Sequence, residues 1–264
     1  VRSSGEPTYF ASDIAYHFNK FLQRGDDSVV NIRGADHKGH VPRMKWAVEA
    51  RGIGRDRLTV LISQVVTRNS EGEVLRVCKR TGYLVTLKEL AEEVGTDACR
   101  FFFLARTPST QMEFDLELAK KESSENPVYY VQYAHARNTS ILSLARERNI
   151  DWSQGDVSLL THPAELELIR ARLQLPERVD QMAANLEPHH LPHYATGLAN
   201  SFHNFYENCR VVSSNDDDIA MTSARLKLVE SAQIVFHRSL DRQGMTAPEQ
   251  IDRAAGRERV ETPG

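Results

Sequence analysis

The chain has 264 residues, of which 41% are hydrophobic and 26% charged, and its formal net charge is −3 at pH 7. This composition is typical of a globular protein with room for two domains, and since no apolar run reaches the length of a membrane span, we expect a cytoplasmic protein with no membrane partner. The slightly acidic balance excludes a uniformly basic nucleic-acid-binding protein but leaves room for a local basic patch.

The first part of the sequence predicts alternating helices and strands. Ser12 or Asp13 can cap a helix, because apolar residues recur after them at helical spacing. Residues 28–33 are a β-branched run that predicts a buried strand, and Asp36 and His37 follow it directly, before a helix over about 42–50. Parallel α/β sheets place ligands beyond the carboxyl ends of their strands, so this order predicts a ligand site at that strand end.

A second strand is predicted over 58–66, and a short basic segment follows it. Lys79 lies in this segment, which closes at Gly82. One interpretation is a loop that presents Lys79 to an anion, and the other is a basic loop that merely faces solvent. Thr86 and Glu89 then have the spacing of a capping box, which predicts the start of a helix.

The run from Asn126 to Arg137 predicts the most distinctive helix. Asn126 can cap it, and the proline that follows fits the first helical position. Tyr130, Tyr133 and Arg137 are three and four residues apart and therefore share one face. Such a face suits stacking against unpaired RNA bases. The alternative is a helix that packs its tyrosines into a core and extends its arginine into solvent.

The remaining sequence predicts only helices. Thr96 or Asp97 is expected to cap one of them, and Pro176 to kink another. Two amphipathic stripes are predicted to face a core, and they consist of Tyr194, Leu198, Phe202, Phe205 and Cys209, and of Leu226, Val229, Gln233, Phe236 and Leu240.

No structural metal is predicted. The chain has three scattered cysteines, an odd number without metal-ligand spacing, which predicts reduced thiols: Cys78, Cys99 and Cys209. A cluster of three histidines lies between and beside two prolines, and we interpret it as a structural connector and not a zinc site: His189, His190 and His193.

Seven ordered motifs together resemble the C-terminal portion of bacterial-type class I arginyl-tRNA synthetases. The matching segments are Tyr9–His17 with Lys20, Gly34–Arg43, Lys79–Gly82 with Val85–Leu87, Glu93–Leu104, Phe114–Ala119, Asn126–Arg137 and Phe202–Val211. The resemblance implies a partial Rossmann-like α/β catalytic domain over residues 1–115, followed by an all-α anticodon-binding bundle over residues 116–264. It also implies the family's reaction, the ATP-dependent charging of arginine tRNA.

The resemblance assigns roles to individual positions. Lys79 matches a catalytic lysine that meets the ATP phosphates. The expected substrate-binding residues are Tyr9 and Asp13, which would read the arginine substrate, and Asp36 and His37, which would line its pocket. The expected tRNA-binding residues are Tyr130, Tyr133, Arg137 and Tyr206. A carboxylate such as that of Asp13 can form two charge-assisted bonds with a guanidinium, which lysine could not match.

The sequence also departs from the family pattern. Arg33 stands where an aromatic residue is usual, and the family's HIGH signature lies upstream of Val1, so the sheet is expected to show an uncovered face and edge. We therefore expect tRNA binding without independent catalysis. The expected partners are arginine tRNA, with arginine and ATP (and Mg²⁺ as its counter-ion) if an N-terminal half is supplied, and the chain is expected to be a monomer or paired with that half. The alternative is a stand-alone truncated paralogue that binds tRNA or docks onto a synthetase.

Overall fold

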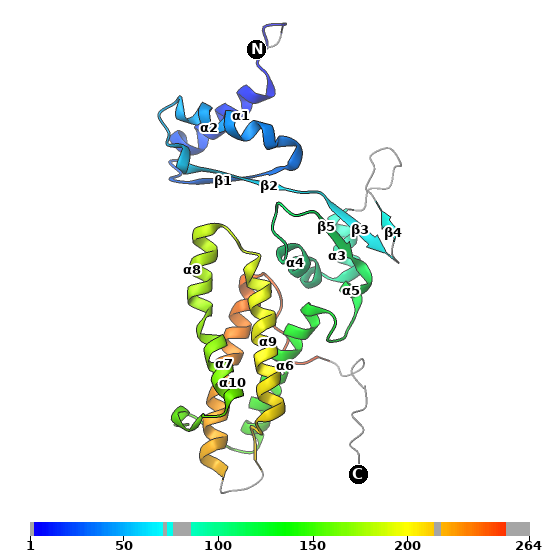
Figure 1. Ribbon diagram of the computed structural model, residues 1–264, viewed down its shortest axis with the longest axis vertical. Coiled ribbons are helices and arrows are strands. Elements are labelled where there is room, and N and C mark those ends of the chain that lie inside the picture. The colour runs from blue at the N-terminus through cyan, green and yellow to red at the C-terminus, as the bar shows by residue number, and fades with distance from the viewer. Residues whose placement is uncertain (1–2, 71–72, 76–85, 214–217, 252–264) are drawn as a thin grey trace. The chain divides into compact units, whose positions relative to one another are not determined.

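The computed structural model describes residues 3–70, 73–75, 86–213 and 218–251, which fall into two compact units (Figure 1). The first unit comprises Val1–Thr67 and Thr107–Glu113, and the second comprises Arg68–Arg106 and Phe114–Gly264. This division differs from the boundary predicted between residues 115 and 116. The reason is that two helices upstream of that boundary pack against helices of the second unit.

The first unit is a small α/β layer. Its elements are α1 (Tyr9–Phe18), β1 (Val29–Gly34), the 3-10 turn η2 (Ala35–His40), α2 (Val41–Glu49) and β2 (Leu58–Ser63). Strands β1 and β2 are parallel, with Val29 opposite Leu58 and Gly34 opposite Ser63. The α/β class predicted for this part of the chain is confirmed. The second strand, however, ends three residues earlier than predicted.

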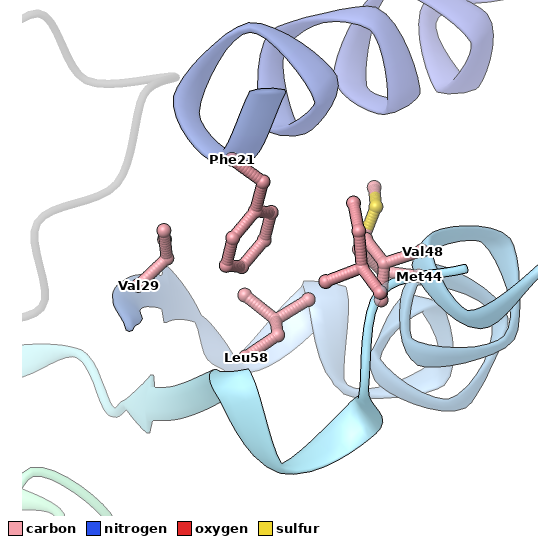
Figure 2. Packing of buried hydrophobic residues seen from close by; sticks show 6 residues of the cluster. Phe21, Val29, Met44, Val48 and Leu58 are labelled. Atoms are coloured by element: carbon pink, nitrogen blue, oxygen red, sulfur yellow. The ribbon is translucent and has the colours of Figure 1, made fainter. Parts of the chain in front are cut away.

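The core of the first unit lies on one face of this sheet (Figure 2). Side chains from both strands meet others from α2 and from the turn after α1, and the labelled ones are Phe21, Val29, Met44, Val48 and Leu58. Each buried side chain of this kind contributes about 1.5–3 kcal/mol. Because side chains alternate along a strand, Val30 and Ile32 face the other way, and they are 46% and 67% exposed. The apolar face expected to be uncovered is therefore present.

A three-stranded sheet follows in the order β4-β3-β5. Its strands are β3 (Val66–Ser70), β4 (Glu73–Leu75) and β5 (Met112–Asp115), and β3 and β4 are antiparallel. The segment predicted to carry Lys79 comes after β4 and lies outside the described residues.

Apart from parts of this sheet, the described residues of the second unit form helices. They are α3 (Leu87–Val94), α4 (Thr96–Leu104), α5 (Leu116–Lys120), α6 (Pro127–Glu147), α7 (Pro163–Leu173), α8 (Leu175–Asn185), α9 (His190–Asn208) and α10 (Ile219–Arg242). The capping box predicted for α3 is present, because the Thr86 hydroxyl accepts from the Glu89 N–H at 3.2 Å and the Glu89 carboxylate accepts from the Thr86 N–H at 2.7 Å. The all-helical fold predicted for the part of the chain after residue 115 is confirmed for its described residues.

The core of the second unit lies among α6, α7, α9 and α10 (Figure 1). Both predicted stripes face it: Phe202 and Phe205 of α9 are fully buried, as are Phe236 and Leu240 of α10. A short turn, η4 (Val157–Leu159), also packs on α10. At Gly155, just before it, a Cβ atom would overlap the Ser223 carbonyl group, so only glycine fits this approach.

Pro176 does more than kink a helix. α7 ends at Leu173 and α8 begins at Leu175, with Pro176 in the first turn of α8. Proline lacks an N–H and clashes with the preceding turn, but it is tolerated in a first turn, where that N–H would have no partner. The predicted kink is therefore a break between two helices.

None of the described helices is both long and apolar enough to cross a membrane. Cys99 and Cys209 are buried free thiols, as expected, while Cys78 lies outside the described residues.

Candidate functional site

The start of α6 is held by Asn126, as the sequence predicts. Its side-chain oxygen accepts from the Val128 N–H at 3.1 Å, which caps the helix. Its amide nitrogen donates to the carbonyl oxygens of Ala119 at 3.1 Å and Lys121 at 2.9 Å. Because Asn126 is only 5% exposed, these bonds replace lost water contacts and tie α6 to the chain before it.

The tyrosine and arginine side chains of α6 meet Tyr206 of α9. The Arg137 guanidinium donates to the Tyr133 hydroxyl at 2.6 Å and lies over the Tyr133 ring, 4.8 Å from its centroid. It also lies 4.4 Å from the centroid of the Tyr206 ring. A cation between two aromatic faces is attracted by both rings. The structure thus brings together three residues that the resemblance assigned to tRNA binding.

His203 joins this group from α9. Its ring centroid is 4.7 Å from that of Tyr130 and 6.0 Å from that of Tyr133. Burial, with a smaller effect from the nearby Arg137 charge, lowers the pKa of His203 to about 4. We call the set formed by Tyr130, Tyr133, Arg137, His203 and Tyr206 the aromatic face.

Sequence reasoning missed His203 as a member of the aromatic face. A usable signal was present, because His203 lies three residues before Tyr206 in a helix and so shares its side.

The aromatic face is neither sealed in a core nor fully exposed. Tyr130, Tyr133 and Arg137 are each half-buried, and Tyr206 is 39% exposed. Burial also raises the pKa of Tyr130. The alternative interpretation, with an arginine free in solvent, does not describe Arg137, whose guanidinium is stacked between two rings.

Another side of α6 holds the segment that follows α10. The Gln132 amide donates to the Asp97 carboxylate at 2.7 Å and to the Thr246 carbonyl at 3.1 Å. The His135 Nδ1–H donates to the Pro248 carbonyl at 3.0 Å. Asp97, which we predicted as a helix cap, instead lies inside the first turn of α4, with Gly95 at the N-cap, and accepts from the Thr246 N–H at 3.1 Å. A left-handed φ of 85° explains why glycine occupies that position.

In the first unit, Asp13 is paired with Arg33 of β1. The Arg33 Nη1 and Nη2 atoms each donate to one oxygen of the Asp13 carboxylate, both at 3.0 Å. The Arg33 guanidinium holds the pKa of Asp13 below its usual range, with smaller contributions from His17 and His37. From the sequence, Arg33 could be identified only as a departure from the family pattern, and its pairing with Asp13 could not be predicted.

A second contact between α1 and β1 involves His17, which lies one helical turn after Asp13. The His17 Nδ1–H donates to the Asp13 carbonyl at 2.8 Å, because a carbonyl can only accept. The Asn31 amide nitrogen then donates to His17 Nε2 at 3.0 Å. His17 is fully buried, and burial lowers its pKa, in keeping with a neutral ring. Together with the Asp13–Arg33 pair, this bond fixes the helix on the strand.

The other predicted substrate residues lie in the same unit. Tyr9 is the first residue of α1 and is 84% exposed. Asp36 and His37 lie in η2, with the His37 Nε2 atom 3.7 Å from the Asp36 carboxylate. His37 is close enough to Asp13 to affect its pKa. The substrate-binding roles of these residues, and the catalytic role of Lys79, stay predictions.

Within the described residues, no three histidine, cysteine, aspartate or glutamate side chains converge as metal ligands do. Only His189 of the histidine cluster lies in the connection between α8 and α9, because His190 and His193 lie in the first turn of α9. His190 also lies 3.5 Å from the Glu187 carboxylate.

Residues 131–251 match the DALR anticodon binding domain. Over 251 residues the chain is 60% identical to an arginine–tRNA ligase of Dehalococcoides mccartyi, and over 258 residues it is 51% identical to one of Heliobacterium modesticaldum. Each match covers 95% of this chain and 45% of the relative. The chain therefore spans slightly less than half the length of these relatives.

Solved structures give the same fold. A Campylobacter jejuni protein assigned as an arginyl-tRNA synthetase superposes with a TM-score of 0.85 at 31% identity, covering 95% of this chain and 54% of that one. The arginyl-tRNA synthetase of Thermus thermophilus superposes with a TM-score of 0.76 at 24% identity, covering 95% and 50%. At this lower identity the second match supports the fold alone.

Proposed function

This chain belongs to the arginyl-tRNA synthetase family, matching its C-terminal portion, and we propose that it binds arginine tRNA through the aromatic face. The observation that carries the proposal is the stack of Arg137 between the rings of Tyr133 and Tyr206. It lies within the segment that matches an anticodon binding domain. An anticodon loop offers unpaired bases, which proteins read by stacking on aromatic and guanidinium groups.

The stack suits this task because its geometry exists before a ligand arrives. Arg137 is held by the Tyr133 hydroxyl, so little side-chain freedom is left to lose when a base docks. Tyr206 is exposed enough to contact a ligand directly. The net charge of −3 provides no general attraction for RNA, so stacking and the local positive charge carry the binding.

The substrate side of the proposal concerns the first unit. Asp13 and Tyr9 would read arginine, Asp36 and His37 would line its pocket, and Lys79 would meet the phosphates of ATP. What supports these roles is the match to arginine–tRNA ligases and the position of η2 directly after the carboxyl end of β1. A carboxylate that already binds a guanidinium in two places has the right geometry for an arginine side chain.

The aminoacylation reaction is proposed for the family's full-length chain and not for these 264 residues alone. The ligases that the chain matches are more than twice its length. We therefore expect no ATP–pyrophosphate exchange when the purified 264-residue chain is incubated with arginine, ATP, Mg²⁺ and tRNA. Measurable exchange would show that the chain activates arginine by itself.

A second candidate function is docking onto a synthetase. The observation that favours it is the exposure of Val30 and Ile32 on the outer face of β1, since contiguous exposed apolar groups mark interaction sites. Replacing both by lysine should abolish co-elution with a full-length arginyl-tRNA synthetase in size-exclusion chromatography. Elution of the unaltered chain apart from the synthetase would remove this candidate.

The test of the main proposal is the dissociation constant for an arginine tRNA transcript, measured by fluorescence anisotropy. Replacing Tyr133 and Arg137 by alanine should weaken binding at least about tenfold, because each stacked base is worth about 1–3 kcal/mol. Arg148→Ala is the matched control, since it removes one exposed positive charge from the end of the same helix. Equal binding by the double variant and the unaltered chain would exclude the aromatic face.

A further inference from the structure

Arg33 presents to Asp13 the same chemical group that free arginine would present. Both guanidinium Nη atoms bond to the carboxylate, one to each oxygen, in the parallel two-bond arrangement that distinguishes arginine from lysine. The two residues are 20 positions apart in the chain, and the pair joins α1 to β1. In this state both carboxylate oxygens are engaged end-on, so a second guanidinium could not bind them in the same parallel arrangement.

The surroundings fix the backbone atoms that carry this pair. Asn31 lies two residues before Arg33 on the same face of β1, and its amide bonds to the buried ring of His17. His17 lies four residues after Asp13 on α1 and bonds back to its carbonyl. The strand and helix are thus held together without the Asp13–Arg33 bonds. The Arg33 side chain can therefore leave the carboxylate while its backbone stays in place.

The pair is also reachable from solvent. The side chain of Asp13 is 33% exposed and that of Arg33 is 19% exposed. Ion pairs with such access contribute little net stability, typically about 0–1 kcal/mol, because water competes for both charges. A soluble guanidinium can therefore approach the same carboxylate.

We propose that Arg33 is a built-in competitor of arginine, occupying the Asp13 carboxylate until a substrate guanidinium displaces it. The inference rests on the proposed role of Asp13 in reading arginine. It makes Arg33 a specificity-determining residue, because only a ligand with two parallel N–H donors replaces both bonds that are lost. A single ammonium is a point charge without the planar fork, so it reproduces this parallel geometry less well.

Competition from within the chain has a calculable effect. When a binding-competent state is populated only in part, the apparent dissociation constant rises by the inverse of that fraction. A carboxylate that is closed about four-fifths of the time would bind arginine about fivefold more weakly than a free one. Removing the Arg33 guanidinium should restore the tighter value.

The experiment compares L-arginine binding by the full 264-residue chain and its variants, using isothermal titration calorimetry. Arg33→Met keeps the length of the side chain but removes its donors, and it should bind arginine about fivefold more tightly than the unaltered chain. Arg33→Met combined with Asp13→Asn should lose that gain. L-citrulline, which has nearly the shape of arginine but no charge, is the ligand control and should bind all forms equally weakly.

Equal arginine affinity of Arg33→Met and the unaltered chain would overturn the inference, including the case in which neither binds. If both forms bind arginine equally and Asp13→Asn alone weakens that binding, Asp13 reads arginine but Arg33 does not compete. If Asp13→Asn has no effect, the proposed role of Asp13 fails as well. Neither result touches the tRNA measurement, which uses a different unit of the chain.

A second measurement covers the case in which Arg33→Met does not fold. In the unaltered chain, the ¹⁵N signals of the Arg33 guanidinium report whether it is bonded to Asp13. Saturating L-arginine should move these signals to the values of a solvent-exposed arginine, whereas citrulline should leave them in place. Unchanged Arg33 signals in the presence of bound arginine would overturn the inference.

Discussion

The imidazole ring of His203 lies against the ring of Tyr130, with centroids 4.7 Å apart and planes inclined by 45°. Its Nε2 atom is buried and has no hydrogen-bond partner among the residues that the structure describes. A proton added to this ring would therefore be buried without an acceptor and close to the positive charge of Arg137. The pKa of His203, lowered to about 4, expresses this cost.

The pH dependence of stability follows from that pKa. In the unfolded chain His203 titrates near its ordinary value of 6.5, so between about pH 6.5 and 4 the unfolded state binds more protons than the folded state. The contribution of His203 to the free energy of unfolding is therefore fully present above pH 6.5. It decreases as the pH drops towards 4, by up to about 3 kcal/mol. His203→Phe should remove this part of the pH dependence in urea unfolding at pH 7 and pH 4.5. A variant with the same pH dependence as the unaltered chain would contradict it.

Glu165 and Arg225 form an ion pair that should matter for stability. The Arg225 Nε–H donates to Glu165 at 2.7 Å, and Glu165 is 1% exposed. Removing one partner of a buried pair leaves the other charge uncompensated and costs about 3–5 kcal/mol. We expect Glu165→Ala to lower the free energy of unfolding by this amount in urea titrations. Glu230→Ala, which breaks the exposed pair with Lys227, should cost no more than about 1 kcal/mol. Similar losses of unfolding free energy in both variants would contradict the claim that burial makes the Glu165–Arg225 pair more important.

Asp97 should control the order of the segment that follows α10. Its carboxylate accepts from the backbone N–H and the hydroxyl of Thr246 and from the Gln132 amide. Asp97→Ala removes the acceptor for all three donors, so amide hydrogen exchange over residues 244–251 should accelerate by at least about tenfold. Glu92→Ala changes an exposed carboxylate on α3 and is the matched control. Unchanged exchange in Asp97→Ala would show that other contacts hold the segment.

Features that depend on neighbouring residues could be predicted from the sequence. The capping box of Thr86 and Glu89 and the cap at Asn126 both formed as expected, because their partners lie within a few residues. The apolar stripes of α9 and α10 were equally plain, since helical spacing alone determines which side chains share a face. A kink was predicted at Pro176, but the full break between α7 and α8 depends on how the two helices pack and could not be predicted.

Features that depend on distant residues could not be predicted in this way. The Asp13–Arg33 pair requires the position of α1 on β1, which no local pattern encodes. Asp97 looked like a helix cap because its partner Thr246 is 149 residues away. The aromatic face was predicted in part, since Tyr130, Tyr133 and Arg137 share a helix. The resemblance supplied Tyr206, and His203 emerged only from the packing of α9 on α6.

Gly155 has a consequence for how this sequence can vary. Its hydrogen atom faces the Ser223 carbonyl of α10 where any larger substituent would collide with the main chain. Nearby, the Ser223 hydroxyl donates to the Asp151 carbonyl at 3.3 Å, so the connection between α6 and α7 lies directly on that helix. Saturation mutagenesis at position 155 should therefore return no tolerated substitution, whereas neighbouring exposed positions accept many. At this position the main chain of Gly155 packs directly against the main chain of α10, and no side chain takes part.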